Sequence, residues 1–249
     1  MENTHVLTES VGSDTRAVVL GQMQGLERAV HAYAEKLATH PIAELCRRGE
    51  VPRRELDEFV RAQYADSTRW VPMLSQMKDV VTEPRLVKAL IENIECETGC
   101  YGMAHTTLAK NFAESIGVSP SFVDTRGFAP IAVHGMEIMN AIASMSEPMI
   151  CGWLMVAEAL VPVLFQVFRP AFERMPSADL EYFDEHIRVD SDEHAEWMAE
   201  AAEALLTRSD CYAELMLGID IGARVTFSVP DAVYARTLAA RSVRVATVV

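Results

Sequence analysis

Residues 149–168, MICGWLMVAEALVPVLFQVF, form the stretch that decides the fold. The stretch is long and apolar enough to cross a bilayer. However, Glu158 lies at its centre, where a carboxylate is costly in lipid. No basic cluster flanks the stretch on either side. The pattern therefore favours a helix buried inside a soluble protein, in which Glu158 must be protonated, paired or bound to a metal.

The rest of the chain has the periodicity of a helical bundle. Apolar residues recur at helical spacing, and the sequence contains no convincing strand alternation. We therefore predict an all-α fold of about seven or eight helices, with a single domain at 15–249 and a flexible tail at 1–14. The predicted helices cover 15–39, 52–81, 84–117 with a break at 98–102, 129–145, 148–174, 177–206, 210–228 and 230–241.

Composition excludes several classes of partner. The chain has 22 Lys and Arg against 36 Asp and Glu, a formal net charge of −14. Nucleic acids and anionic membranes both require a basic surface, so neither is an expected partner. The five cysteines form no CxxC motif, and their odd number excludes a complete disulfide framework. Reduced thiols and the lack of a signal-peptide pattern predict a cytoplasmic protein.

Residues 186–194, HIRVDSDEH, predict half of a metal site. On a helix, His186, Asp190 and His194 project from one face, and Glu193 borders it. Nitrogen and carboxylate donors together suit iron, manganese or zinc better than calcium or magnesium. The alternative is a solvated acidic face, which is the usual fate of a run of charges.

Two other places offer the remaining donors. Segment 93–105 contains Glu95, Glu97 and His105, and the apolar helix contains Glu158. Three helices would then supply enough carboxylates and imidazoles for two metal ions that share a bridging carboxylate.

Each of these donors also has a structural interpretation. His105 could be a core histidine with a satisfied hydrogen bond, and Glu158 could pair with Arg169 or Arg224. A competing ligand pair lies elsewhere in the chain, at His134 and Glu137.

Three motifs in this chain resemble those of the heme-oxygenase-like diiron oxidases and oxygenases, relatives of the thiaminase-like and pyrroloquinoline-quinone-synthase-like proteins. The family motif Asn-Leu-x-x-Glu-x-Gly, followed by His-x-x-Leu, is similar to residues 93–99 and 105–108. A lone Glu in an apolar helix matches residues 152–158. The motif His-x-x-x-Asp-x-x-His after an aromatic pair matches residues 182–194. The motifs occur in the family's order, and the resemblance extends over about residues 20–225.

The resemblance implies a set of metal ligands. Glu97, His105 and His186 would bind one iron, Asp190 and His194 the other, and Glu158 would bridge the irons or complete the second.

Two of these ligand identities stay open. Glu95 has the ten-residue spacing to His105 that some members show, so it competes with Glu97. Glu193 occupies the place of the family's last histidine. A one-residue π-bulge would be needed to bring His194 there instead.

The resemblance also implies a function. The protein would be an O₂-dependent non-heme diiron oxygenase or oxidase with two Fe(II) ions and O₂ as co-substrate. It would oxidise a small amino-acid-derived substrate in specialised metabolism, by N-oxygenation, oxidative C–C cleavage, decarboxylation or desaturation. Family habit predicts a homodimer.

Two other functions remain open at this point. A metal-free thiaminase-like hydrolase or ligand-binding domain would need a cysteine nucleophile with an acidic partner, and a heme oxygenase would need an early histidine such as His31. The expected cavity walls are Trp70, Met73, Tyr101, Phe128, Trp153, Met155 and Phe227. The expected cations for a substrate carboxylate are Arg69, Lys110 and Arg224.

Overall fold

The computed structural model describes residues 3–100, 102–119, 140–189 and 193–246. Every regular element within these ranges is a helix, so the predicted all-α fold is confirmed. The elements are α1 (Asn3–Ala38), α2 (Pro41–Arg48), α3 (Arg53–Val80), α4 (Pro84–Glu97), α5 (His105–Ser115), the 3₁₀ helix η2 (Ile142–Ser144), α8 (Glu147–Phe172), α9 (Glu181–Val189), α10 (Glu193–Arg208) and α11 (Tyr212–Ala246).

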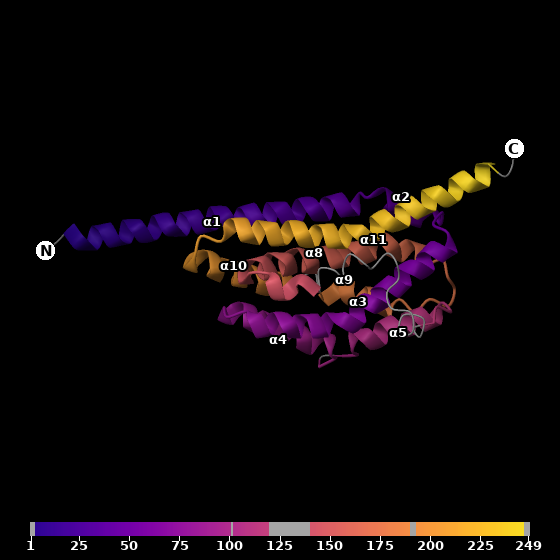
Figure 1. The fold of residues 1–249 in the computed structure, drawn as a ribbon, viewed down its shortest axis with the longest axis horizontal. Coiled ribbons are helices and arrows are strands. Elements are labelled where there is room, and N and C mark those ends of the chain that lie inside the picture. Colours follow the sequence, from indigo (N-terminus) through magenta and orange to yellow (C-terminus); the bar gives the residue numbers. More distant parts are fainter. Residues whose placement is uncertain (1–2, 101, 120–139, 190–192, 247–249) are drawn as a thin grey trace.

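The helices surround α8. Helices α1 and α11 lie side by side along one edge of the bundle, and α4 and α5 lie along the opposite edge (Figure 1). Helix α8 contacts α1, α2, α9, α10 and α11. The N-terminal part of α1 and the C-terminal end of α11 project from opposite ends of the bundle (Figure 1). Helix α1 begins at Asn3, within the stretch that the sequence predicts as a tail.

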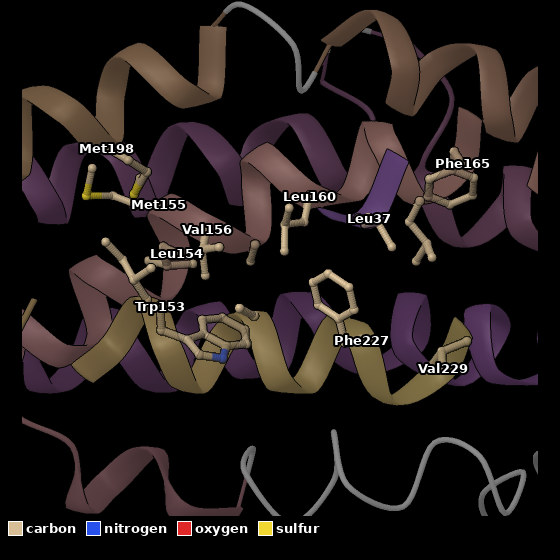
Figure 2. Packing of buried hydrophobic residues seen from close by; sticks show 14 of the residues in the cluster. Leu37, Trp153, Leu154, Met155, Val156, Leu160, Phe165, Met198, Phe227 and Val229 are labelled. Atoms are coloured by element: carbon tan, nitrogen blue, oxygen red, sulfur yellow. The ribbon is translucent and has the colours of Figure 1, made fainter. Parts of the chain in front are cut away.

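Helix α8 is the core helix that its sequence predicts. Among the described residues it is the one helix long and apolar enough to cross a membrane, yet 78% of its most apolar window is buried inside the protein. Its side chains fill the space between neighbouring helices. Figure 2 shows those of Trp153, Leu154, Met155, Val156 and Leu160 between Met198 of α10 and Phe227 of α11. Glu158 is 3% exposed among them.

Glycines allow α8 and α11 to pack with their backbones in contact. A methyl group added at Gly152 of α8 would collide with the carbonyl oxygen of Leu215 in α11. A methyl group at Gly218 of α11 would collide in the same way with the carbonyl oxygen of Met149 in α8. Any side chain at these positions must push the two central helices apart.

We expect Gly152→Ala to lower the free energy of unfolding by about 1–3 kcal/mol, because the added methyl group overpacks a backbone contact that cannot give way. Urea denaturation followed by circular dichroism measures this change. The matched control is Gly21→Ala in α1, where no atom lies within 4 Å of the added carbon. Alanine favours helix by up to about 1 kcal/mol over glycine, so this control should be neutral or stabilising. Equal losses in both variants would contradict the packing argument.

The C-terminal helix differs from the prediction. Predicted helices 210–228 and 230–241 form the single helix α11, with Pro230 inside it. A proline removes one backbone hydrogen bond and bends a helix, but it does not have to end it. Val229 and Val233 are both buried on either side of Pro230. Their burial in the core holds the two halves in one helix.

The predicted helix 177–206 is described as two helices, α9 and α10, and residues 190–192 between them lie outside the described ranges. Helix α9 begins later than Ser177 predicts, because the Asp179 side chain accepts a hydrogen bond from the Glu181 amide at 3.1 Å. Most of the predicted helix 129–145 also lies outside the described residues.

Candidate metal centre

Three buried side chains from three helices meet beside α8. Glu97 ends α4, His105 begins α5, and His186 lies on α9. One potential donor atom from each lies within 4.8 Å of the other two. All three side chains are at most 8% exposed. The imidazole rings of His105 and His186 lie 4.5 Å apart, centroid to centroid.

The break between α4 and α5 brings Glu97 and His105 together. Gly99 adopts a φ of +88°, in the left-handed region that glycine favours. A methyl group at Gly99 would lie 2.7 Å from the backbone nitrogen of Ala104. The chain therefore turns tightly at this glycine and restarts a helix at His105. The predicted break at 98–102 is confirmed.

His105 has an incompletely satisfied ring. Its Nδ1 atom lies 3.0 Å from Oε1 of Glu97 but has no partner with hydrogen-bond geometry among the described residues. Burial lowers the pKa of His105, but Cys96 and Glu97 beside the ring more than offset this and raise the pKa to about 10. The metal-free imidazole is therefore protonated at neutral pH, and a metal ion bound at Nδ1 would displace that proton.

His186 is held in one orientation by its own helix. Its Nδ1 lies 2.8 Å from the carbonyl oxygen of Tyr182. A carbonyl only accepts hydrogen bonds, so Nδ1 carries the proton and Nε2 carries the lone pair that can bind a metal. The ring stacks on Phe165 at 4.7 Å and contacts Tyr182 edge-on at 4.5 Å. These aromatic contacts fix the ring and keep its surroundings apolar.

Glu158 is oriented by a polar chain that begins on α3. The side-chain amide of Asn93 donates to Oε1 of Glu158 at 2.7 Å. The indole N–H of Trp70 in turn donates to Oδ1 of Asn93 at 3.3 Å. Arg169, one of the two arginines considered as a partner, instead pairs with Asp184 at 2.9 Å.

The structure describes the side chains of some of the other candidate ligands but not of all of them. The side chain of Glu95 is exposed, whereas that of Glu97 is buried beside His105. Asp190 lies outside the described residues. The backbones of Glu193 and His194 belong to α10, but their side chains are not described, so the choice between them stays a prediction. The competing pair His134 and Glu137 also lies outside the described residues.

A cavity of about 140 Å³ adjoins the cluster, and its walls include Glu97, Glu158 and His186. Its volume is similar to that of a ~150 Å³ engineered cavity that holds benzene. Three of the predicted wall residues line it, namely Trp70, Met73 and Trp153. Met155 and Phe227 do not line it, and Tyr101 and Phe128 are outside the described residues.

The expected cations are absent from the described walls of this cavity. None of Arg69, Lys110 and Arg224 lines it. The walls instead include Gln63, Asp66 and Ser67 of α3, which were not among the predicted site residues. Their spacing of three and four residues around Trp70 was the available signal, because it places them on one helix face.

The donors at the cluster fit a metal ion. Two donors bound to one ion at ~2.1 Å lie roughly 3 Å apart, and Nδ1 of His105 and Oε1 of Glu97 are 3.0 Å apart. The His105 Nδ1 atom is buried and faces the Glu97 carboxylate without hydrogen-bond geometry. A mixed set of imidazoles and carboxylate suits iron, manganese or zinc.

A sequence-family comparison places these features in a known class. The model of the iron-containing redox enzyme family matches residues 57–226, which include Glu97, His105, Glu158 and His186. The chain belongs to the iron-containing redox enzyme family. A comparison with curated proteins finds no match.

Solved structures show the same fold. A TenA homologue from Pseudomonas syringae pv. tomato superimposes with a TM-score of 0.67 and 10% identity, over 85% of this chain and 92% of that chain. A TenA homologue from P. horikoshii gives a TM-score of 0.62 and 10% identity, over 86% of this chain and 98% of that chain. The heme-oxygenase-like fold expected from the resemblance is therefore confirmed.

Proposed function

We propose that the protein is an O₂-dependent non-heme diiron oxygenase or oxidase that acts on a small amino-acid-derived substrate. The observation that carries this proposal is the buried cluster of Glu97, His105 and His186, in a chain of an iron-containing redox family. We propose that these three side chains bind one iron. The second iron would use Glu158, Asp190 and His194.

The side chains around the cluster have distinct roles in this proposal. Bound iron would supply the reduction of O₂. The Tyr182 carbonyl holds the His186 ring, and Phe165 stacks on it and excludes water. Asn93 holds the Glu158 carboxylate in one orientation. The adjoining cavity would hold the substrate next to these donors.

The metal-free hydrolase has weaker support. A thiaminase-like reaction needs a reactive cysteine in the cavity, and no cysteine is among the described residues that line it. Burial raises the pKa of Cys46 to about 12 and also raises that of Cys151. These thiols are therefore protonated and unreactive at neutral pH. His31, the candidate heme ligand, is exposed and pairs with Glu35 at 3.2 Å.

Anaerobic titration of the metal-free protein with Fe(II) tests the proposed function. We expect saturation at about two irons per chain, because the predicted ligands suffice for a carboxylate-bridged pair. Rapid mixing with O₂ should then consume O₂ and give a transient visible absorption. His31→Ala is the control and should titrate like the wild type, because the His31 side chain is exposed whereas the cluster residues are buried.

Three outcomes would contradict the proposal. Saturation at one iron would reject the diiron centre. A Soret band on addition of heme, without Fe(II) binding, would favour a heme oxygenase. No binding of iron or heme would favour the metal-free hydrolase or ligand-binding domain.

A further inference from the structure

The cavity has a second polar region that is separate from the proposed metal ligands. Gln63, Asp66, Ser67 and Trp70 line it from successive turns of α3, and Trp153 lines it from α8. Their spacing on α3 places them on one face of the helix. The indole rings of Trp70 and Trp153 lie 5.6 Å apart. We call these five residues the α3 subsite.

Asp66 supplies the α3 subsite with a carboxyl group that can pair with a cation. Asp66 has no salt bridge to another described residue, and the guanidinium of nearby Arg69 donates to the Ala65 carbonyl at 3.3 Å. Burial raises the pKa of Asp66 to about 7, and the positive charge of Arg69 lowers it only in part. A carboxylate with a pKa raised by burial gains stability when a cation binds beside it.

Two further groups of the subsite lack partners. The Ser67 hydroxyl and the Trp153 indole N–H are buried and make no hydrogen bond to the described residues. Ser67 is 7% exposed and Trp153 is 4% exposed. Such groups mark places where a ligand supplies the missing bonds. The Ser67 oxygen can accept a hydrogen bond from an ammonium group, whereas the Trp153 N–H can only donate and would pair with an acceptor atom elsewhere on the ligand.

The charged residues of the cavity walls favour a ligand with a positive charge. The described walls contain the carboxylates of Asp66, Glu97 and Glu158 but no lysine or arginine. Metal ions bound at Glu97 and Glu158 would neutralise those two carboxylates and leave Asp66 as the remaining acidic group of the described walls. An anionic group at the α3 subsite would meet the Asp66 carboxylate and no lysine or arginine among the described wall residues, whereas an ammonium group would pair with Asp66.

We propose that the α3 subsite binds the protonated amine of the substrate, so that the substrate is a small organic amine. This inference rests on the proposed function, because it treats the cavity beside the metal ligands as the substrate site. Asp66 forms the ion pair, Ser67 accepts a hydrogen bond from the ammonium group, and the indole faces of Trp70 and Trp153 attract the cation. Apolar side chains such as Met73 and Val161 contact the rest of the molecule.

Calorimetric titration with three probes of similar size tests this proposal. The probes are benzylamine, which is protonated at neutral pH, benzyl alcohol, which is neutral, and benzoate, which is an anion. The full-length protein is used both metal-free and loaded anaerobically with Fe(II). We expect benzylamine to bind at least about tenfold more tightly than either other probe, the effect of one charge-assisted contact.

We expect Asp66→Asn to lower the affinity for benzylamine about tenfold and to leave that for benzyl alcohol unchanged. Asparagine keeps the shape of the side chain and removes a partly buried charge, so the variant should fold and be no less stable. The matched control is Asp79→Asn on the same helix, where the carboxylate is exposed and pairs with Lys78 at 2.9 Å. This control should bind benzylamine like the wild type.

The proposal is overturned if Asp66→Asn binds benzylamine as the wild type does, if benzoate binds most tightly, or if benzylamine does not bind. Iron titration of the same variants separates this result from the proposed function. Asp66-dependent amine binding without iron binding would reject the diiron enzyme and keep the amine subsite. Iron binding without selectivity for benzylamine would reject the amine subsite and keep the diiron enzyme.

Discussion

We expect His186→Ala to lower the affinity for Fe(II) by at least about 100-fold and to abolish O₂ consumption, because it removes one of three clustered donors. Loss of a residue that only supports a metal ligand already costs about 10–100-fold, so loss of a ligand itself should cost more. Anaerobic titration with Fe(II), followed by metal analysis of the desalted protein, measures the change. Added imidazole should partly restore binding, because the alanine leaves a space beside Phe165 that fits the missing ring.

Folding and ligand loss can be separated with a second variant. Glu97→Gln keeps the size of the side chain but removes the charge that lies 3.0 Å from His105. We expect it to weaken iron binding while the circular dichroism spectrum stays that of the wild type. If both His186→Ala and Glu97→Gln bind iron as tightly as the wild type, the cluster is not the metal site.

The fold was largely predictable because helix periodicity is a local property. The pattern of α8, with one carboxylate among apolar residues, identified the core helix. The predicted helix boundaries are wrong where long-range packing determines where a helix ends. Pro230 reads as a helix end, but burial of its neighbours in the core holds α11 together. Helix α2, of only eight residues, is too short for a periodicity signal, although His40 and Pro41 mark its start.

The site was predictable where a single segment forms it. Leu86, Leu90, Asn93 and Glu97 share one helix face, and all four are buried. This periodicity favours Glu97 over Glu95, which lies on the opposite face. The approach of His186 to His105 depends on how α9 packs against α5, so only the family resemblance could predict it. Asp66 was not predicted as a cavity residue, because a single polar residue on a helix is expected to be solvent-exposed until its neighbours in space are known.

Asn93 is expected to control the second iron through Glu158. Its side chain is 1% exposed and connects the indole N–H of Trp70 with the Glu158 carboxylate. Asn93→Ala removes both bonds, leaves the buried Glu158 carboxylate and the partly buried Trp70 indole without these partners, and frees the carboxylate to rotate. We expect the second equivalent of Fe(II) to bind about 10–100-fold more weakly, the usual effect of removing a residue that orients a metal ligand. The first equivalent, bound at Glu97, His105 and His186, should bind as in the wild type. Stepwise anaerobic titration separates the binding of the first and second equivalents of Fe(II).

A conservative substitution distinguishes orientation from packing. Asn93→Asp keeps the size of the side chain but replaces the amide donor with a carboxyl group that faces Glu158. Two carboxylates so close cannot both be ionised, so one of them should hold a proton and its pKa should rise. We therefore expect Asn93→Asp to weaken the second iron as much as Asn93→Ala does, although it fills the same space. Asn111→Ala on α5, whose amide contacts only the Met103 sulfur at 3.6 Å among the contacts described, is the matched control and should bind two irons normally. Asn93→Leu fills a similar space but has no donor at all. If it binds two irons like the wild type while Asn93→Ala does not, Asn93 supports the site by filling space, and the hydrogen bond to Glu158 has no part in metal binding.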